Sequence, residues 1–408
     1  VEGGPISFHS TARADALIAS LGIGGEKIYA RPTARRRYVV RDGTLHDVPT
    51  SPRALLKSSL LSPMGKARML AEIFIPARKS AAEESLAQLV RRRLGQDVLS
   101  YLIDPFVSGV YAGDPSHLSA SFALPMLGRL ERDHGGILRG VFASRRRRAA
   151  STARGPMTSF RSGMQILPMA IGAELGTSLR VNHAVTKVDR VNDQWIVTGV
   201  FEGAPFTVSA PQLIVATAAH ALHKIEWQGD VKSALEPVMR VRYAPVATVA
   251  LGYTRSQVAH ALDGFGVLVP SAELRGILGI LFNSSTFCCR TSEDQVLLTV
   301  FLGGARQKRL PSAADLTAIA HREVSQLLGV SGKPVMTRTM VWPTGIPQFD
   351  VGHASVVEAA EAMSRTFPGL RLVGSYIDGV AIGDCIERGD AAGVLAVAQL
   401  KLRDRAVS

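Results

Sequence analysis

Residues 374–382 read Gly374-Ser375-Tyr376-Ile377-Asp378-Gly379-Val380-Ala381-Ile382, directly after Leu370-Arg371-Leu372-Val373. Leu370 to Gly374 predict a strand before the glycine-rich turn, and the residues from 391 to 400 predict a following helix. The start of a helix offers free backbone N–H groups and the positive end of a dipole. The stretch therefore predicts a site for an anionic or carbonyl-rich ligand between a strand and a helix.

Strands and helices alternate on both sides of a β-rich insertion in the rest of the chain. The expected strands are 37–45 (two strands and a turn), 179–188, 195–200, 213–217, 246–253, 276–282, 296–302 and 370–374. The expected helices are 11–23, 86–94, 164–175, 315–328 and 391–400. A sheet assembled from distant pieces of chain predicts an α/β fold with α+β insertions and discontinuous domains.

Residues 51–150 have a helical pattern in which lysines and arginines alternate with leucines and methionines. Such a basic amphipathic segment fits either one buried and one solvated face or contact with an anionic membrane surface. The arginine clusters 91–93 and 145–148 are expected to be solvated, the second of them in a loop. Because no aromatic residues alternate with them and no known reading motif accompanies them, we expect no nucleic-acid binding.

The composition and the common catalytic motifs exclude several classes. With 408 residues, 46% of them hydrophobic, the chain can bury a large core, and its net charge of +13 favours anionic partners. Cys288, Cys289 and Cys385 give neither a disulfide framework nor a zinc motif, so a reducing cytoplasm fits best. The sequence contains no HExxH, GxSxG or P-loop motif and no run of about 18 apolar residues that would span a membrane.

Five groups of residues, the stretch 374–382 among them, carry a resemblance. They are Leu102-Ile103-Asp104-Pro105-Phe106-Val107-Ser108-Gly109-Val110-Tyr111-Ala112-Gly113-Asp114 with Leu118-Ser119; Glu2-Gly3-Gly4-Pro5 with Ser7-Phe8; Ser159-Phe160 with Gly163-Met164-Gln165 and Leu167-Pro168; Ile346-Pro347-Gln348 with Gly352-His353; and Gly374-Ser375-Tyr376 with Gly379-Val380-Ala381-Ile382. In kind and in order they resemble the FAD-dependent protoporphyrinogen and coproporphyrinogen oxidases of haem biosynthesis, among the amine-oxidase-like flavoproteins. The resemblance runs over nearly the whole chain.

The resemblance implies a domain organisation and a cofactor. It implies an FAD-binding domain (1–30, 156–220 and 340–408), a β-rich substrate domain (31–50 and 221–339) and a helical, membrane-associated domain (51–155). It implies that Gly4, Pro5, Ile6, Ser7, Val380, Ala381 and Ile382 lie along FAD, with Val185 beside the adenine and Trp342 as a further contact. Gly22 to Lys27 lacks the third glycine of a dinucleotide fingerprint, so we expect the first βαβ unit to be missing and FAD retention to be weak.

The substrate implied by the resemblance is a porphyrinogen, oxidised to the porphyrin with dioxygen as electron acceptor. The implied contacts are Arg37 for a propionate and Phe265, Gly266, Leu268, Leu281 and Phe301 for the macrocycle. Aromatic and branched side chains suit a flat apolar ligand, and a guanidinium suits a carboxylate. We assign no catalytic acid or base and no metal, because the gain in aromaticity drives the reaction and the protein mainly orients the substrate.

Three questions stay open at this point. Ser162 and Ile6 depart from the family pattern, which leaves the choice between protoporphyrinogen and coproporphyrinogen undecided. The alternatives in function are an FAD-dependent amine or carotenoid-precursor oxidase and a non-catalytic porphyrin-binding protein. Peripheral contact with the cytoplasmic membrane and a homodimer are both compatible with the sequence.

Overall fold

The computed structural model describes residues 1–78, 80, 82–147, 155–307, 309–377 and 379–407. They form two compact units, each assembled from three separate stretches of chain. Unit 1 comprises Val1–Ser7, Glu26–Met164 and Tyr243–Val351, and unit 2 comprises Phe8–Gly25, Gln165–Arg242 and Gly352–Ser408. Both units mix helices and strands, which confirms the predicted mixed α/β class. The three domains with their boundaries stay a prediction.

A seven-stranded sheet runs through unit 1. In spatial order its strands are β15 (Met336–Pro347), β11 (Tyr243–Thr254), β14 (Gln295–Gly303), β13 (Gly279–Phe282), β12 (Gly266–Leu268), β3 (Tyr38–Arg41) and β4 (Thr44–Asp47). Neighbouring strands are antiparallel except for the parallel pair β12 and β3. The sequence predicted β3, β4, β11, β13 and β14, but it missed β12 and β15.

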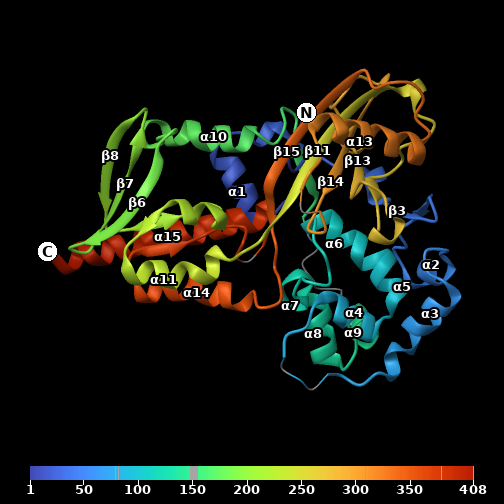
Figure 1. Cartoon of the computed structure of the whole chain (residues 1–408), viewed down its shortest axis with the longest axis horizontal. Helices are drawn as coiled ribbons and strands as arrows, with labels where there is room; N and C mark the ends of the chain where they lie inside the picture. Colours follow the sequence, from blue (N-terminus) through green and yellow to red (C-terminus); the bar gives the residue numbers. More distant parts are fainter. Residues whose placement is uncertain (79, 81, 148–154, 308, 378, 408) are drawn as a thin grey trace. The chain divides into compact units, whose positions relative to one another are not determined.

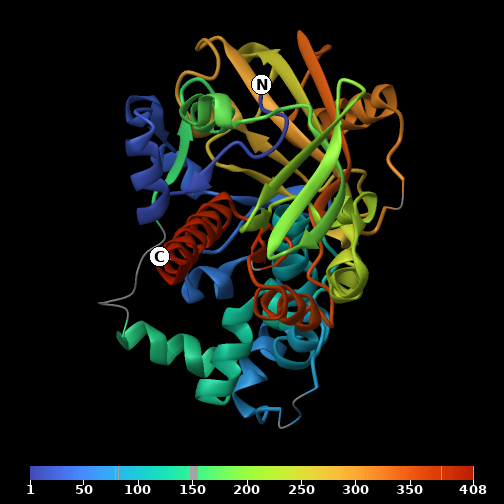
Figure 2. The same cartoon turned by 90° about the vertical axis from the view of Figure 1, so that its left-hand side faces the viewer.

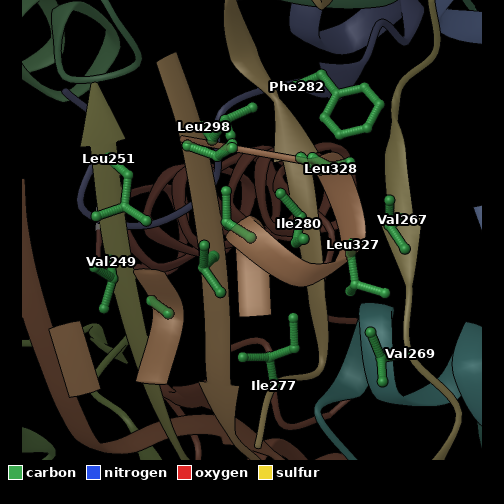
Figure 3. Close-up of a cluster of buried hydrophobic side chains, with 14 of the residues drawn as sticks. Val249, Leu251, Val267, Val269, Ile277, Ile280, Phe282, Leu298, Leu327 and Leu328 are labelled. Carbon is green, nitrogen blue, oxygen red and sulfur yellow. The ribbon is translucent and has the colours of Figure 1, made fainter. Parts of the chain in front are cut away.

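One face of this sheet is apolar and is covered by helix α13 (Ala313–Leu328), which was expected at 315–328 (Figure 1). The strands contribute buried side chains such as Val249, Ile280 and Leu298, and the helix contributes Leu327 and Leu328 (Figure 3). Successive residues of a strand point to opposite faces. The core therefore determines which residues of the same strands lie on the other face.

Helices make up most of the described part of 51–150, as predicted. They are α2 (Pro52–Lys57), α3 (Pro63–Leu70), α4 (Leu86–Arg93), α5 (Gln96–Val98), α6 (Asp104–Tyr111), α7 (Ala120–Ala123), α8 (Pro125–His134) and α9 (Ile137–Arg147). The loop expected around 145–148 is wrong for residues 145–147, because α9 continues to Arg147. Arg148 lies outside the described residues.

The solvated arginine cluster expected at 91–93 is also wrong for two of its three members. Arg93 is fully buried and forms an ion pair with the equally buried Glu72. Arg92 lies 2.7 Å from both Glu84 and Glu131. Glu72 also accepts hydrogen bonds from the backbone N–H groups of Ile137 (2.8 Å) and Leu138 (3.2 Å), at the start of α9. These arginines hold the helices of unit 1 together, because each is matched by carboxylates distant in sequence.

The other short elements of unit 1 lie beside the sheet. Strands β2 (Lys27–Tyr29) and β5 (Met157–Phe160) pair in antiparallel fashion, and the four-residue helix α12 (Asn283–Thr286) follows β13.

Unit 2 contains two small sheets and several helices. One sheet has the order β10 (Glu226–Trp227), β6 (Ala184–Val191), β7 (Gln194–Phe201), β8 (Ala204–Ala210), and the other pairs β9 (Leu213–Val215) with β16 (Leu370–Leu372) in parallel. Strand β1 (Phe8–His9) and helices α1 (Ala12–Ser20), α10 (Ile166–Leu175), α11 (Gly229–Met239), α14 (Ala354–Thr366) and α15 (Ile382–Val407) complete the unit. Helix α11 packs against α14, and α15, drawn in red in Figure 2, is the longest helix.

No helix in the described ranges combines the length and the apolar content that crossing a bilayer requires.

Candidate functional site

The face of the seven-stranded sheet opposite α13 carries three of the residues predicted to hold the macrocycle. Leu268, Leu281 and Phe301 each follow or precede a residue of the buried core along their strand, so their side chains leave the sheet on the other side. Leu281 pairs directly with Gly266 on β12 and with Thr299 on β14. All three large side chains are half-buried. The sheet thus places these apolar groups, distant in sequence, on one surface.

Gly266 is required by the sheet itself. A Cβ atom added at this position would lie 2.1 Å from the carbonyl oxygen of Ile280 and 3.1 Å from Cα of Leu281. Both atoms belong to the backbone of the paired strand β13, which cannot yield without breaking the pairing. The position therefore requires glycine because the backbone of the neighbouring strand approaches it closely.

Leu268 is positioned by α6, which lies in the segment 102–114 that carries part of the family resemblance, hereafter the signature segment. A Cβ atom added to Gly109 would lie 2.6 Å from Leu268 Cδ2. The glycine therefore gives the leucine side chain room to lie directly on the helix backbone.

Arg37 and its neighbour Arg36 have different surroundings. Arg36 forms ion pairs with Asp47, at 2.6 Å, and with Asp263. Arg37 lies over the Phe265 ring, with its guanidinium carbon 5.3 Å from the ring centroid, and partial burial lowers its pKa. In the described part of the chain, no carboxylate pairs with Arg37. Arg37 thus keeps its five donors for an external acid group.

Backbone carbonyls of the N-terminal residues 2–7 accept hydrogen bonds from side chains elsewhere in unit 1. The Gly3 carbonyl accepts hydrogen bonds from Trp342 Nε1 (2.8 Å) and Thr248 Oγ1 (3.2 Å), and the Ile6 carbonyl accepts one from Ser159 Oγ (2.7 Å). Trp342 and Thr248 lie on the face of the sheet that also carries Phe301. Gly4 has open space where a side chain would be, and Pro5 is exposed. These residues therefore leave a surface on which a flat ligand can lie.

The two departures from the family pattern have local explanations. The Ile6 side chain is buried in a cluster with Ile28 and Phe287, so it points into the protein. The backbone N–H of Ser162 (3.1 Å) and its hydroxyl (2.8 Å) both donate hydrogen bonds to Glu26 Oε2. Gly163 beside it has a φ of +97°, which favours glycine.

The signature segment 102–114 is held by an arginine that sequence reasoning missed. Arg306 lies 2.7 Å from Asp104 Oδ1 and 3.0 Å from Asp114 Oδ1, and the second oxygen of Asp104 accepts the backbone N–H of Ser271 (2.7 Å). Desolvation raises the pKa of Asp114, but the Ser116 backbone N–H and Arg306 outweigh it, so the pKa is lowered. Both aspartates serve to position α6. No sequence signal could have paired them with an arginine about 200 residues away.

In unit 2, the turn before α15 has the form predicted from the sequence. Val380 and Ala381 precede Ile382, the first residue of the 26-residue helix, and the Ala381 carbonyl accepts the Cys385 N–H. Gly383 packs against the start of α1, where a Cβ atom would lie 3.2 Å from Thr11 Cγ2. The amides at this helix start and the dipole suit an anionic or carbonyl-rich group.

Val185 lies in β6 of the same unit, next to an irregularity in its pairing with β7. Its side chain is half-buried, and nearby His183 stacks on Phe201 with ring centroids 4.3 Å apart. Within the described residues, no three His, Cys, Asp or Glu side chains are grouped so as to hold a metal ion.

Comparison with known proteins assigns the chain, with the residues described above in both units, to one family. Residues 1–395 match the family described as flavin containing amine oxidoreductase. Protoporphyrinogen oxidase 2 of Arabidopsis thaliana is 30% identical, over 98% of this chain and 85% of its own length. Coproporphyrinogen III oxidase of Bacillus subtilis is 26% identical, over 96% of this chain and 85% of its own.

The fold agrees with this relationship. A crystal structure from Exiguobacterium sp. 255-15, provisionally assigned as a protoporphyrinogen oxidase, superposes with a TM-score of 0.80 at 19% identity, covering 98% of this chain and 88% of that chain. The predicted amine-oxidase type of fold is confirmed. The chain thus belongs to the flavin-containing amine oxidoreductases, and its cofactor is FAD, as the sequence predicted.

Proposed function

We propose that the chain oxidises a porphyrinogen to the porphyrin, with protoporphyrinogen IX as its substrate and dioxygen as the final electron acceptor. The observation that carries the proposal is the sheet face of unit 1. It presents Leu268, Leu281 and Phe301 as one apolar surface, and Arg37 lies over Phe265 without a carboxylate partner among the described residues. This combination suits a flat apolar macrocycle that bears propionates. The names of the relatives from Arabidopsis thaliana and Bacillus subtilis favour the same class of substrate.

The residues of the chain bind and orient in this proposal. The apolar face buries the macrocycle and excludes water from it, while Arg37 fixes one edge by a charge-assisted hydrogen bond to a propionate. Trp342 and Thr248 hold Gly3, so that residues 4–7 keep one conformation along the cofactor. FAD, when bound, supplies the acceptor for the hydride. No side chain is assigned as acid or base, because orientation and the gain in aromaticity suffice.

Protoporphyrinogen IX is favoured over coproporphyrinogen III by the character of this surface. Coproporphyrinogen carries two propionates where protoporphyrinogen carries apolar vinyl groups, and each additional carboxylate needs a basic partner or water. The half-buried groups that we assign to the macrocycle are all apolar.

The test is an aerobic assay of porphyrin fluorescence with FAD added and each porphyrinogen offered separately. We expect porphyrin to form from protoporphyrinogen IX at the higher kcat/KM, with peroxide released. A trace no steeper than autoxidation with both substrates, from a folded and flavin-loaded sample, would contradict the proposal. Turnover of an amine instead would favour the alternative oxidase, and tight porphyrin binding without turnover would favour the non-catalytic protein.

We also propose peripheral contact with a membrane through the helices of 51–155. Met64 is 78% exposed and Phe74 is 81% exposed, and Lys57 and Lys66 belong to the same stretch. Apolar side chains beside cations suit an anionic bilayer surface. Flotation with vesicles of anionic lipid tests this, and loss of binding in Phe74→Ser is the expected result. The homodimer and the three domain boundaries stay predictions.

A further inference from the structure

Two adjacent cysteines lie in the turn between α12 and β14. Cys288 and Cys289 are both free, the first half-buried and the second exposed. Cys289 has a φ of +63°, a left-handed conformation that a residue with a Cβ adopts at some cost in energy. The turn therefore offers an accessible thiol with a second thiol on the neighbouring residue.

The turn is connected to the segment that we place along the cofactor. Arg290 donates to Ser159 Oγ at 2.6 Å, lies 3.4 Å from Glu2 Oε1 and lies over the Phe287 ring. Ser159 in turn holds the Ile6 carbonyl.

The apolar side of the turn reaches the same segment. Cys288 packs against the cluster of Ile6 and Phe287, and so does Leu281 of the proposed substrate surface. A change in the backbone at residue 289 would therefore act on residues 2–6 through Arg290 and through this cluster.

We propose that Cys288 and Cys289 form a dithiol that a peroxide oxidises to a reversible disulfide, and that this bond loosens the attachment of residues 2–7. The Cys289 thiolate attacks the peroxide oxygen, the O–O bond breaks, and a sulfenic acid and water form. The Cys288 thiol then attacks the sulfenic sulfur, the S–S bond forms, and a second water leaves. Two thiols and one hydrogen peroxide thus give one disulfide and two waters.

The geometry of adjacent residues makes this bond reversible. Neighbouring Cα atoms are about 3.8 Å apart, whereas ordinary disulfides join Cα atoms about 4.4–6.8 Å apart. A bond in this turn is strained, and strained, exposed disulfides are the ones that thiols reduce readily. The peroxide that the proposed oxidase releases would be the oxidant inside the cell, so the physiological source rests on the proposed function; the thiol chemistry does not.

The test uses the full chain with added hydrogen peroxide and no porphyrinogen, followed by thiol titration and intact mass. We expect two thiols and about 2 Da to be lost per chain, without cross-linked dimers, and dithiothreitol to restore both. Cys385→Ser is the matched control and should behave like the parent. Cys385 is exposed, but desolvation of its thiol and the neighbouring Asp384 raise its pKa, so this third thiol should react slowly. Cys289→Ser should not lose the 2 Da.

Several results would overturn the site: a disulfide between chains, a gain of oxygen that dithiothreitol does not reverse, or the same mass loss in Cys289→Ser. Hydrogen exchange of residues 2–7 measures whether the disulfide loosens the attachment of this segment. We expect faster exchange after oxidation of the parent and no change in the Cys288→Ser, Cys289→Ser double variant. Unchanged exchange in the oxidised parent would overturn the coupling. Because peroxide is added and no turnover is needed, each of these outcomes can be measured even if the chain does not oxidise porphyrinogens.

Discussion

Arg306 lies 2.7 Å from Asp104, a carboxylate 202 residues earlier in the chain and almost fully buried. The same guanidinium binds Asp114 through two nitrogens, at 3.0 and 3.1 Å. Asp104 begins α6 and Asp114 follows its end, so the arginine spans the helix that carries Gly109. One side chain thereby fixes the helix against which Leu268 packs.

Arg306→Lys should destabilise unit 1. A lysine has a single charged nitrogen and cannot satisfy both carboxylates in the forked geometry of a guanidinium. Since Asp104 is buried, losing a charged hydrogen bond there should lower the free energy of unfolding by about 1–3 kcal/mol. Urea unfolding followed by circular dichroism measures this. Arg309→Lys, at an exposed neighbouring position, is the control and should stay within about 0.5 kcal/mol of the parent. Equal stability of both variants would contradict the assignment.

The contribution of this pairing should depend on pH. The pKa of Asp114 is lowered in the folded chain, so its stabilising effect is complete above the ordinary pKa of 3.8. The effect is lost as the pH falls through the lowered, folded pKa, because the folded carboxylate then takes up a proton as well. The difference in free energy of unfolding between parent and Arg306→Lys should therefore shrink below about pH 4. A difference that grows in acid would rule out a charged Asp114 as the partner.

Buried strands could be predicted from the sequence, and exposed or cross-chain features could not. The segments 246–253 and 296–302 read as nearly continuous apolar runs because β11 and β14 are buried on both faces. Strand β15 was missed because it lies at the sheet edge and half of its residues are exposed, so it does not read as an apolar run. The arginine run at 91–93 looked solvated because the partners of Arg93 and Arg92, Glu72 and Glu131, lie 21 and 39 residues away.

In the candidate site, too, some features could be predicted from the local sequence and others could not. A helix after the glycine-rich turn was predictable because the strand, turn and helix are consecutive, but it begins at Ile382 and not at the expected residue 391. Gly266 was predicted only as a contact of the macrocycle, whereas its close approach to the β13 backbone depends on the sheet register and could not be predicted. The anchoring of Gly3 by Trp342 joins residues 339 apart, beyond the reach of any local pattern.

Gly109→Ala should impair substrate binding while the chain stays folded. The added methyl group would lie 2.6 Å from Leu268 Cδ2 and must push this side chain into the proposed substrate surface. Alanine is also the better helix former by up to about 1 kcal/mol, which offsets the steric cost in stability. We expect a raised KM for protoporphyrinogen IX at nearly unchanged unfolding midpoint. Gly128→Ala in α8, where the nearest atom is the flexible end of Arg132 at 3.3 Å, should leave KM unchanged. If both variants behave alike, the contact with Leu268 does not shape the site.

Glu72→Gln should be among the more damaging changes in the helical part. The substitution leaves the buried Arg93 with its charge less compensated, since its other contacts include the carbonyls of Ile75 and Pro76 and a longer ion pair with Glu131 at 3.7 Å. Breaking a buried ion pair from one side costs about 3–5 kcal/mol. Thermal and urea unfolding measure the loss, and Asp133→Asn on exposed α8 surface is the control. A double replacement, Glu72→Met with Arg93→Met, should recover much of the stability. Failure to recover would mean that capping of α9 by Glu72 matters more than charge balance.

Arg37→Ala should weaken binding of the porphyrinogen without disturbing the fold. The guanidinium has the Phe265 ring beneath it and no carboxylate partner among the described residues, so its removal breaks no internal ion pair. Loss of one charge-assisted hydrogen bond to a propionate corresponds to about 1.5–3 kcal/mol, or roughly ten- to more than a hundredfold in KM. Steady-state kinetics with protoporphyrinogen IX measures this, and Arg37→Lys should restore part of the affinity through charge alone. Arg35→Ala, exposed two residues earlier, is the control for overall charge. Arg36 forms ion pairs with Asp47 and Asp263, so Arg36→Ala should instead lower the free energy of unfolding. If Arg37→Ala lowered the free energy of unfolding in the same way and left KM unchanged, Arg37 would have a structural role and not a role in substrate binding.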